Sequence, residues 1–225
     1  MFIFELSAIK IHTMDAIENF YLSCINCKNT KNNCPGIWKD KKEGVMPKGF
    51  FYWTTSPKIF IVGKNPGHPL PTETDRYKDK SDFDILIAHK RLVKEVFNDS
   101  NLKTTFHKNV NRYVRFFLDL SSDPQISIFD YVSYTNLVKC STEKETGRIS
   151  TKTIQNCFTN YFVKEIELFK PKVILALGGE VKKFLAKQRL SIPIISVKHP
   201  SYYYKKEDEL KILSEIKERL KIYIP

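Results

Sequence analysis

Three short apolar runs stand out along the chain, and two of them are followed directly by glycine. Residues 58–62, 173–177 and 192–197 are almost continuously apolar. Runs of this length without alternation are typical of strands that are buried on both faces of a parallel sheet. A fourth strand is predicted within residues 126–137, where the apolar side chains cluster and do not follow helical spacing.

Between and after these runs, apolar positions recur with helical spacing. The longest such segment has Ser150 or Thr151 as its predicted N-cap, and Pro171 closes it. Because strands and helices alternate, the sequence predicts an α/β fold with a mainly parallel sheet covered by helices on both faces. The helices are predicted at residues 84–97, 107–120, 150–169, 180–187 and 207–223.

The chain is predicted to form one domain over residues 1–225. It shows no internal repeat or long linker, and a chain of this length can bury a large core. With 42% hydrophobic residues it contains ample apolar material for folding. No apolar stretch approaches the roughly 20 residues that a membrane span requires. Since no secretory signal is visible either, we expect no membrane partner and a cytoplasmic location.

The charge of the chain points to an anionic partner. Lys and Arg number 37 against 25 Asp and Glu, which leaves a net charge of +12. A polyanion is therefore the first partner to consider, although many basic proteins bind no nucleic acid specifically. Charge alone does not identify that polyanion.

Sites in parallel α/β sheets form beyond the carboxyl ends of the strands, so the loops there hold the candidate residues. The loop of residues 63–69 has glycines where a backbone turns sharply or a ligand approaches. The alternative is an ordinary turn, because Asn-Pro and Pro-Gly are common turn dipeptides. Near another strand end, the Asn136 amide offers one donor and one acceptor to a flat ligand, or it caps a turn.

A third loop, residues 197–206, follows an apolar strand with a histidine, a hydroxyl group, three tyrosines and several lysines. Aromatic rings interleaved with cations suit stacking on bases and neutralising phosphates. The alternative interpretation is a tyrosine-rich helix start that packs on the core.

The cysteines suggest a metal site. Cys24 and Cys27 have the Cys-x-x-Cys spacing of zinc and iron-sulfur sites, and Cys140 and Cys157 form a second pair. Four thiolates are enough to close one site, with four unligated buried thiols as the alternative. Cys34 is left over.

Taken in order along the chain, these segments resemble the uracil-DNA glycosylase superfamily, and most closely its iron-sulfur branch, often called family 4. Each motif is modest alone, and their joint order carries the resemblance, which spans residues 24–204. The motifs are Cys24 with Cys27, Gly63 to Gly67, Asn136 to Cys140, Cys157, Pro171 to Gly178, and His199 to Ser201.

The resemblance implies a three-layer α/β/α sandwich with a four-stranded, mainly parallel sheet. It also implies a structural [4Fe-4S] cluster on Cys24, Cys27, Cys140 and Cys157, which ties the N-terminal segment of residues 1–50 onto the domain. Zinc is the alternative metal. Uracil-containing DNA is the implied partner, and a monomer is expected.

The resemblance also implies roles for individual residues. His199 would stabilise the uracil anion as it leaves, and Asn136 would hydrogen-bond the uracil edge. Asn65 would position the attacking water. Uracil would stack on an aromatic ring, for which Tyr77 is preferred over Phe83. Further substrate contacts are expected from Gly63, Lys64, Pro66 and Gly67, and DNA contacts from Lys198, Ser201, Tyr202 and Lys205.

The first loop departs from the iron-sulfur family. That family usually has an acidic or small residue there, whereas this chain has Lys64 and Asn65. The sequence Gly-Lys-Asn-Pro-Gly looks more like the mismatch-specific and single-strand-selective branches. We therefore predict a monofunctional glycosylase that removes uracil, with other deaminated bases as further candidate substrates. A DNA-binding member with altered catalysis is the alternative, and a zinc-stabilised nucleotide-binding domain is a third interpretation.

Overall fold

The computed structural model divides into two compact units, each assembled from three stretches of the chain. The first unit comprises Met1–Phe51, Asn65–Lys90 and Asn136–Lys170, and the second comprises Tyr52–Lys64, Arg91–Thr135 and Pro171–Pro225. The organisation as a single domain stays a prediction. The structure describes residues 19, 49–51, 54, 56–67, 81, 84, 87, 88, 91, 95, 97, 104–120, 126–142, 149–202 and 204–224.

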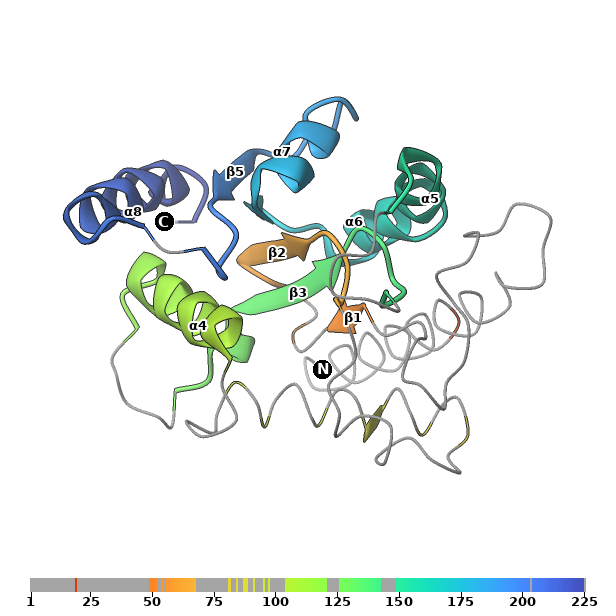
Figure 1. Cartoon of the computed structure of the whole chain (residues 1–225), viewed down its shortest axis with the longest axis horizontal. Coiled ribbons are helices and arrows are strands. Elements are labelled where there is room, and N and C mark those ends of the chain that lie inside the picture. Colours follow the sequence, from red (N-terminus) through yellow and green to blue (C-terminus); the bar gives the residue numbers. More distant parts are fainter. Residues whose placement is uncertain are drawn as a thin grey trace, which may run out of the picture. The chain divides into compact units, whose positions relative to one another are not determined.

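A parallel sheet forms the centre of the second unit (Figure 1). Its strands are β2 (Ile59–Gly63), β3 (Val132–Asn136), β4 (Val173–Leu177) and β5 (Ile194–Val197), in the spatial order β3-β2-β4-β5. In register, Ile59 lies opposite Val173 and Ile174 lies opposite Ile194, and both of these strand pairs are parallel. Every residue of β2 and β4 is buried, as expected for central strands covered on both faces.

Helices cover this sheet. They are α4 (Thr105–Phe117), α7 (Gly179–Leu185) and α8 (Lys206–Lys221). The Thr104 hydroxyl accepts a hydrogen bond from the His107 backbone and so caps α4. Helix α4 packs against α8, whereas α7 packs on β4 and β5 from the other side (Figure 1). One stripe of α4 is buried, as helical spacing requires: Val110, Tyr113, Val114 and Phe117.

The first unit contains the carboxyl end of β3 and a long interrupted helix. Strand β1 (Phe50–Phe51) follows Gly49, whose carbonyl accepts from the Asn136 backbone N–H. The helix consists of α5 (Thr151–Cys157), a π-helical turn (Phe158–Phe162) and α6 (Val163–Phe169). Ser150 caps it and Lys170 ends it in the left-handed conformation. π-helical turns are frequent near functional sites.

The α/β fold class predicted from the sequence is confirmed. The predicted strand at 173–177 is β4, and the run at 126–137 divides into a 3-10 turn (Ile128–Asp130) followed by β3. Helix α4 begins two residues before the predicted start because Thr104 provides the cap. Among the described residues, no helix is long and apolar enough to cross a membrane.

Candidate functional site

Three chain segments emerge at one edge of the sheet in the second unit, because β2, β4 and β5 run in the same direction. Gly63 ends β2, Gly178 follows β4, and His199 lies two residues beyond β5. The Lys64 ammonium group pairs with the Glu180 carboxylate at 2.7 Å. This contact joins the loop after β2 to the first turn of α7.

Gly178 gives His199 room to approach the sheet edge. Its φ is +93°, which favours glycine, and a Cβ built there would lie 3.3 Å from the His199 Cβ. The Gly178 N–H donates to the Val197 carbonyl at 2.8 Å. The backbone after β4 is therefore fitted closely to the histidine loop.

The surroundings of His199 favour its neutral imidazole with the proton on Nε2. Its Nδ1 accepts a hydrogen bond from the Ser201 backbone N–H at 3.3 Å. Burial lowers the pKa of His199 below its ordinary value of 6.5. The Phe106 ring lies 5.5 Å from the imidazole between ring centres. His199 can therefore donate a hydrogen bond from Nε2 without carrying a charge.

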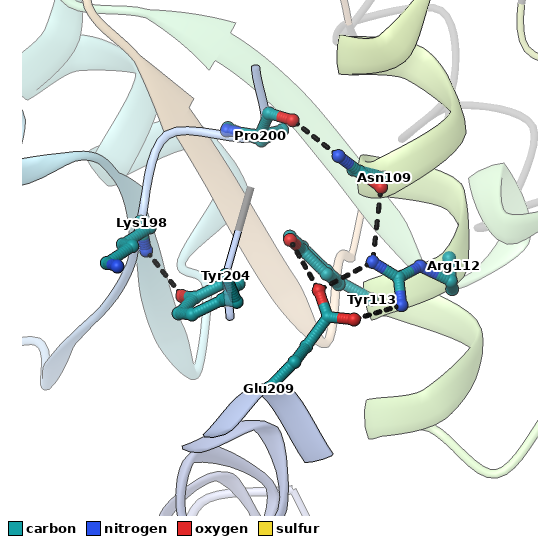
Figure 2. A network of polar contacts seen from close by, with 7 residues as sticks. All are labelled: Asn109, Arg112, Tyr113, Lys198, Pro200, Tyr204 and Glu209. Atoms are coloured by element: carbon teal, nitrogen blue, oxygen red, sulfur yellow. Dashed lines mark hydrogen bonds and ion pairs between the residues drawn. The ribbon is translucent and has the colours of Figure 1, made fainter. Parts of the chain in front are cut away.

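The predicted DNA-contacting residues lie on the surface of the segment between β5 and α8. Tyr202 is 69% exposed, and Lys198, Ser201 and Lys205 are exposed as well. Tyr204 differs, because its ring is buried and its hydroxyl accepts from the Lys198 backbone N–H at 2.9 Å (Figure 2). The core-packing interpretation thus applies to Tyr204, whereas Tyr202 is available to a ligand.

A polar network connects this segment to α4 and α8 (Figure 2). Asn109 donates to the Pro200 carbonyl at 2.6 Å, and its own carbonyl accepts from Arg112 at 3.2 Å. Two 2.7 Å hydrogen bonds join the Arg112 guanidinium to the Glu209 carboxylate. The Arg112 hydrogen bond holds the pKa of Glu209 below its usual range. Burial and the Glu209 charge raise the pKa of Tyr113 to about 12.

In the first unit, Gly49 holds both ends of the turn that contains Asn136. The Gly49 N–H donates to the Lys139 carbonyl at 2.8 Å, and the Gly49 carbonyl accepts from the Asn136 N–H at 3.3 Å. A Cβ on Gly49 would lie 3.0 Å from the Lys139 Cα. Asn136 is itself fully buried. The backbone that presents its amide is therefore tightly restrained.

A buried ion pair supports the same turn. The Lys139 ammonium group contacts the Glu165 carboxylate at 2.5 Å and donates to the Asn136 carbonyl at 2.6 Å. Both charged side chains are 0% exposed. The π-helical turn places the Phe162 ring 5.9 Å from the Lys139 ammonium group. Lys139 is thus a structural cation, unlike Lys198 and Lys205, which are expected from the sequence to contact DNA.

In this unit, the loop that follows β2 contacts the segment that follows Asn136. Asn65, Pro66 and Gly67 are half-buried, and the Gly67 carbonyl accepts from the Thr142 N–H at 3.0 Å. The loop is therefore hydrogen-bonded to the segment that follows Cys140.

The described part of the first unit contains two of the four predicted metal ligands. Cys140 and Cys157 are 2% and 1% exposed, and neither is in a disulfide. Two buried thiols suit thiolate ligands of a metal shielded from water. Cys24 and Cys27 lie outside the described residues, as does Tyr77. Within the described ranges, no three metal-binding side chains group together.

Several residues of these arrangements were not singled out from the sequence. Phe106 and Asn109 lie at the start of α4, before and just after its predicted first residue. Glu165 lies far along the chain from Lys139, so local patterning gives no sign of the pair. Gly178, by contrast, ends one of the motifs named from the sequence, because glycine directly after a buried strand marks a close backbone approach.

The burial of His107 in α4 should make the stability of the protein depend on pH. Burial lowers its pKa to about 4, and its Nδ1 lies 2.7 Å from the Thr104 hydroxyl. Because the unfolded state binds a proton near pH 6.5 and the folded state does not, stability should fall as pH decreases from 6.5 to 4. The variant His107→Phe should remove up to about 1.4 kcal/mol per pH unit of that slope.

Urea unfolding of both proteins at several pH values measures this effect. The difference between them isolates His107 from the carboxylates, which titrate in both. Parallel stability curves would contradict the burial of a neutral His107.

The family comparison agrees with the fold and the strand-end loops. The model of the uracil DNA glycosylase superfamily matches residues 50–221. This match covers most of the chain, and the protein belongs to the uracil-DNA glycosylase superfamily. That membership supports a glycosylase-type function on DNA and a role in DNA repair. A search of curated proteins found no match.

Proposed function

We propose that this protein is a monofunctional uracil-DNA glycosylase, which hydrolyses the bond between C1′ of the sugar and N1 of uracil. Other deaminated bases are further candidate substrates. Beyond family membership, one observation carries the proposal. The Ser201 N–H occupies Nδ1 of His199, which leaves a neutral imidazole with its proton on Nε2.

A donor of this kind suits the charge that develops during the reaction. As the glycosidic bond breaks, its electron pair moves into uracil, and the sugar becomes oxocarbenium-like. A hydrogen bond from His199 Nε2 to uracil O2 strengthens as the negative charge forms. A neutral imidazole supplies this bond without first releasing a proton.

Asn136 and Asn65 have complementary roles in the proposal. Asn136 reads the uracil edge with its amide, and cytosine presents the opposite arrangement of donor and acceptor. Asn65 orients the water that adds to C1′ and then loses a proton. An amide is a poor base, but a dissociative reaction needs orientation of this water more than deprotonation. No lysine nucleophile is required.

The remaining contacts are assigned to the substrate. Gly63, Lys64, Pro66 and Gly67 supply loop contacts, and Tyr77 stacks on the base. Uracil-containing DNA binds through its phosphates and vacated stack to the exposed residues Lys198, Ser201, Tyr202 and Lys205. The protein acts as a monomer.

We assign a structural [4Fe-4S] cluster to Cys24, Cys27, Cys140 and Cys157. The burial of Cys140 and Cys157 supports this assignment, and zinc is the alternative. When bound, the cluster would supply structural cross-linking of the segments that carry these four cysteines. A brown protein absorbing broadly near roughly 400 nm supports the cluster, and a colourless zinc protein overturns it.

The second candidate is a DNA-binding superfamily member with altered catalysis. The absence of a carboxylate between Gly63 and Gly67 favours it. The two functions differ in whether the base is released.

An excision assay separates them. The purified protein is incubated with single- and double-stranded DNA containing one uracil, and abasic sites are then cleaved with alkali. We expect cleavage at the uracil position only, with matched thymine-containing DNA as the control. Cleavage before alkali would contradict the monofunctional assignment. Tight binding without release of uracil would instead establish the second candidate.

A further inference from the structure

We propose that Asn109 is a positioning residue that fixes the orientation and tautomer of His199 through the peptide between Pro200 and Ser201. The inference rests on the proposed function of His199. The Asn109 side chain acts on the backbone that follows His199, where it donates to the Pro200 carbonyl (Figure 2).

The connection runs through one planar group. The Pro200 carbonyl accepts from Asn109 Nδ2 at 2.6 Å, and the Ser201 N–H donates to His199 Nδ1 at 3.3 Å. This carbonyl and this N–H belong to the same trans peptide, so they turn together. Rotation of that peptide away from Asn109 would withdraw the N–H from Nδ1. The Asn109 contact therefore holds the proton on Nε2.

The orientation of the Asn109 amide is itself determined by its partners. Arg112 has only donors and contacts the Asn109 oxygen at 3.2 Å, whereas the Pro200 carbonyl has only acceptors. The amide satisfies both partners in one orientation alone. Arg112 is held in turn by its two hydrogen bonds to Glu209 on α8. Pro200 is a buried residue, so its carbonyl group also requires a hydrogen-bond donor, and Asn109 provides one.

The nearby surface hollow does not offer a better interpretation of these residues. It has a volume of about 550 Å³, and Lys108, Arg112, Arg115 and Lys217 contribute cations to it. However, Arg112 pairs with Glu209, and Lys217 pairs with Asp119. These contacts offset the positive charge that a phosphate site would need. The network is therefore better explained as support for the His199 loop.

A charge-matched pair of variants tests the proposal. Asn109→Asp keeps an acceptor for Arg112 but replaces the donor to Pro200 with a carboxylate oxygen. Asn111→Asp makes the same change two residues along α4, where the Asn111 oxygen accepts from Arg115 at 3.2 Å. Both variants keep their arginine contact and add the same charge. Only Asn109→Asp removes a hydrogen bond to the histidine loop.

Two measurements on these full-length proteins are compared. Nitrogen NMR of labelled histidine reports the tautomer of His199, and single-turnover assays report uracil release separately from the Kd for DNA. We expect Asn109→Asp to lose the uniform Nε2–H tautomer and to release uracil at least about tenfold more slowly. Its Kd should match that of Asn111→Asp, which should keep the wild-type tautomer and rate.

Equal His199 spectra and equal rates in the two variants would overturn the inference. A lower melting temperature in Asn109→Asp with an unchanged tautomer would also overturn it, because that result indicates support of the fold only. If Asn109→Asp does not fold, Asn109→Ala takes its place, because it removes the donor without adding charge. Its His199 tautomer and its rate of uracil release are then measured in the same way. If the wild-type protein releases no uracil, the proposed function fails, and the NMR comparison still decides the role of Asn109.

Discussion

Replacing His199 with alanine is expected to slow uracil release by about 100- to 1,000-fold in single-turnover assays. The variant lacks the Nε2–H donor that would stabilise the uracil anion. That interaction forms fully only in the transition state, so the loss should appear in the rate and not in the Kd for uracil-containing DNA. The alkali cleavage assay and a binding titration measure the two quantities separately.

A conservative variant distinguishes the donor from the volume of the ring. His199→Gln keeps an amide N–H near the position of Nε2 and should recover part of the rate lost in His199→Ala. Thermal melting checks that both variants fold, because the His199 ring also packs against the Phe106 ring. A wild-type rate in His199→Ala would exclude the assigned role.

The second large effect is expected on stability. Glu165→Leu should destabilise the folded protein by about 3 to 5 kcal/mol, because it leaves the buried Lys139 ammonium group without its carboxylate. Urea unfolding at pH 7 measures the change. Glu180→Gln is the matched control, since its pair with Lys64 is exposed on the surface. That control should cost less than about 1 kcal/mol.

A double variant separates stability from the support of Asn136. Lys139→Met combined with Glu165→Leu removes both buried charges and should recover most of the lost stability. It still lacks the hydrogen bond from Lys139 to the Asn136 carbonyl, so uracil release should remain slower than in the wild-type protein. If Glu165→Leu costs no more than Glu180→Gln, the pair contributes little to folding.

The sequence predicted the sheet well because its central strands, β2 and β4, are buried on both faces. Continuous apolar runs such as β2 and β4 are a local signal, and a glycine follows or ends each of them. Because sites in parallel sheets form beyond the carboxyl ends of the strands, the sequence also pointed to His199. The structure places His199 beside Gly178 at the sheet edge of the second unit. The apolar runs and the glycines after them are signals from residues that are neighbours in the chain.

Long-range partners were harder to predict. A lysine beside a cysteine gives no sign that Lys139 is buried against Glu165, because the pair forms only after two distant segments meet. In the sequence, Asn109 is an ordinary polar residue of a predicted helix, and nothing near it in the chain indicates its contact with Pro200. The tyrosine run illustrates the same limit, since burial alone separates Tyr204 from Tyr202.

The order of the strands has a consequence for synthesis of the protein on the ribosome. Strand β2 is made early, yet it lies between β3 and β4, which are translated much later. Until residue 177 has left the exit tunnel, the nascent chain carries a fully apolar strand without its β4 neighbour. Such unpaired edges favour aggregation. Fragments that stop before Val173 should therefore require chaperones or accumulate as inclusion bodies.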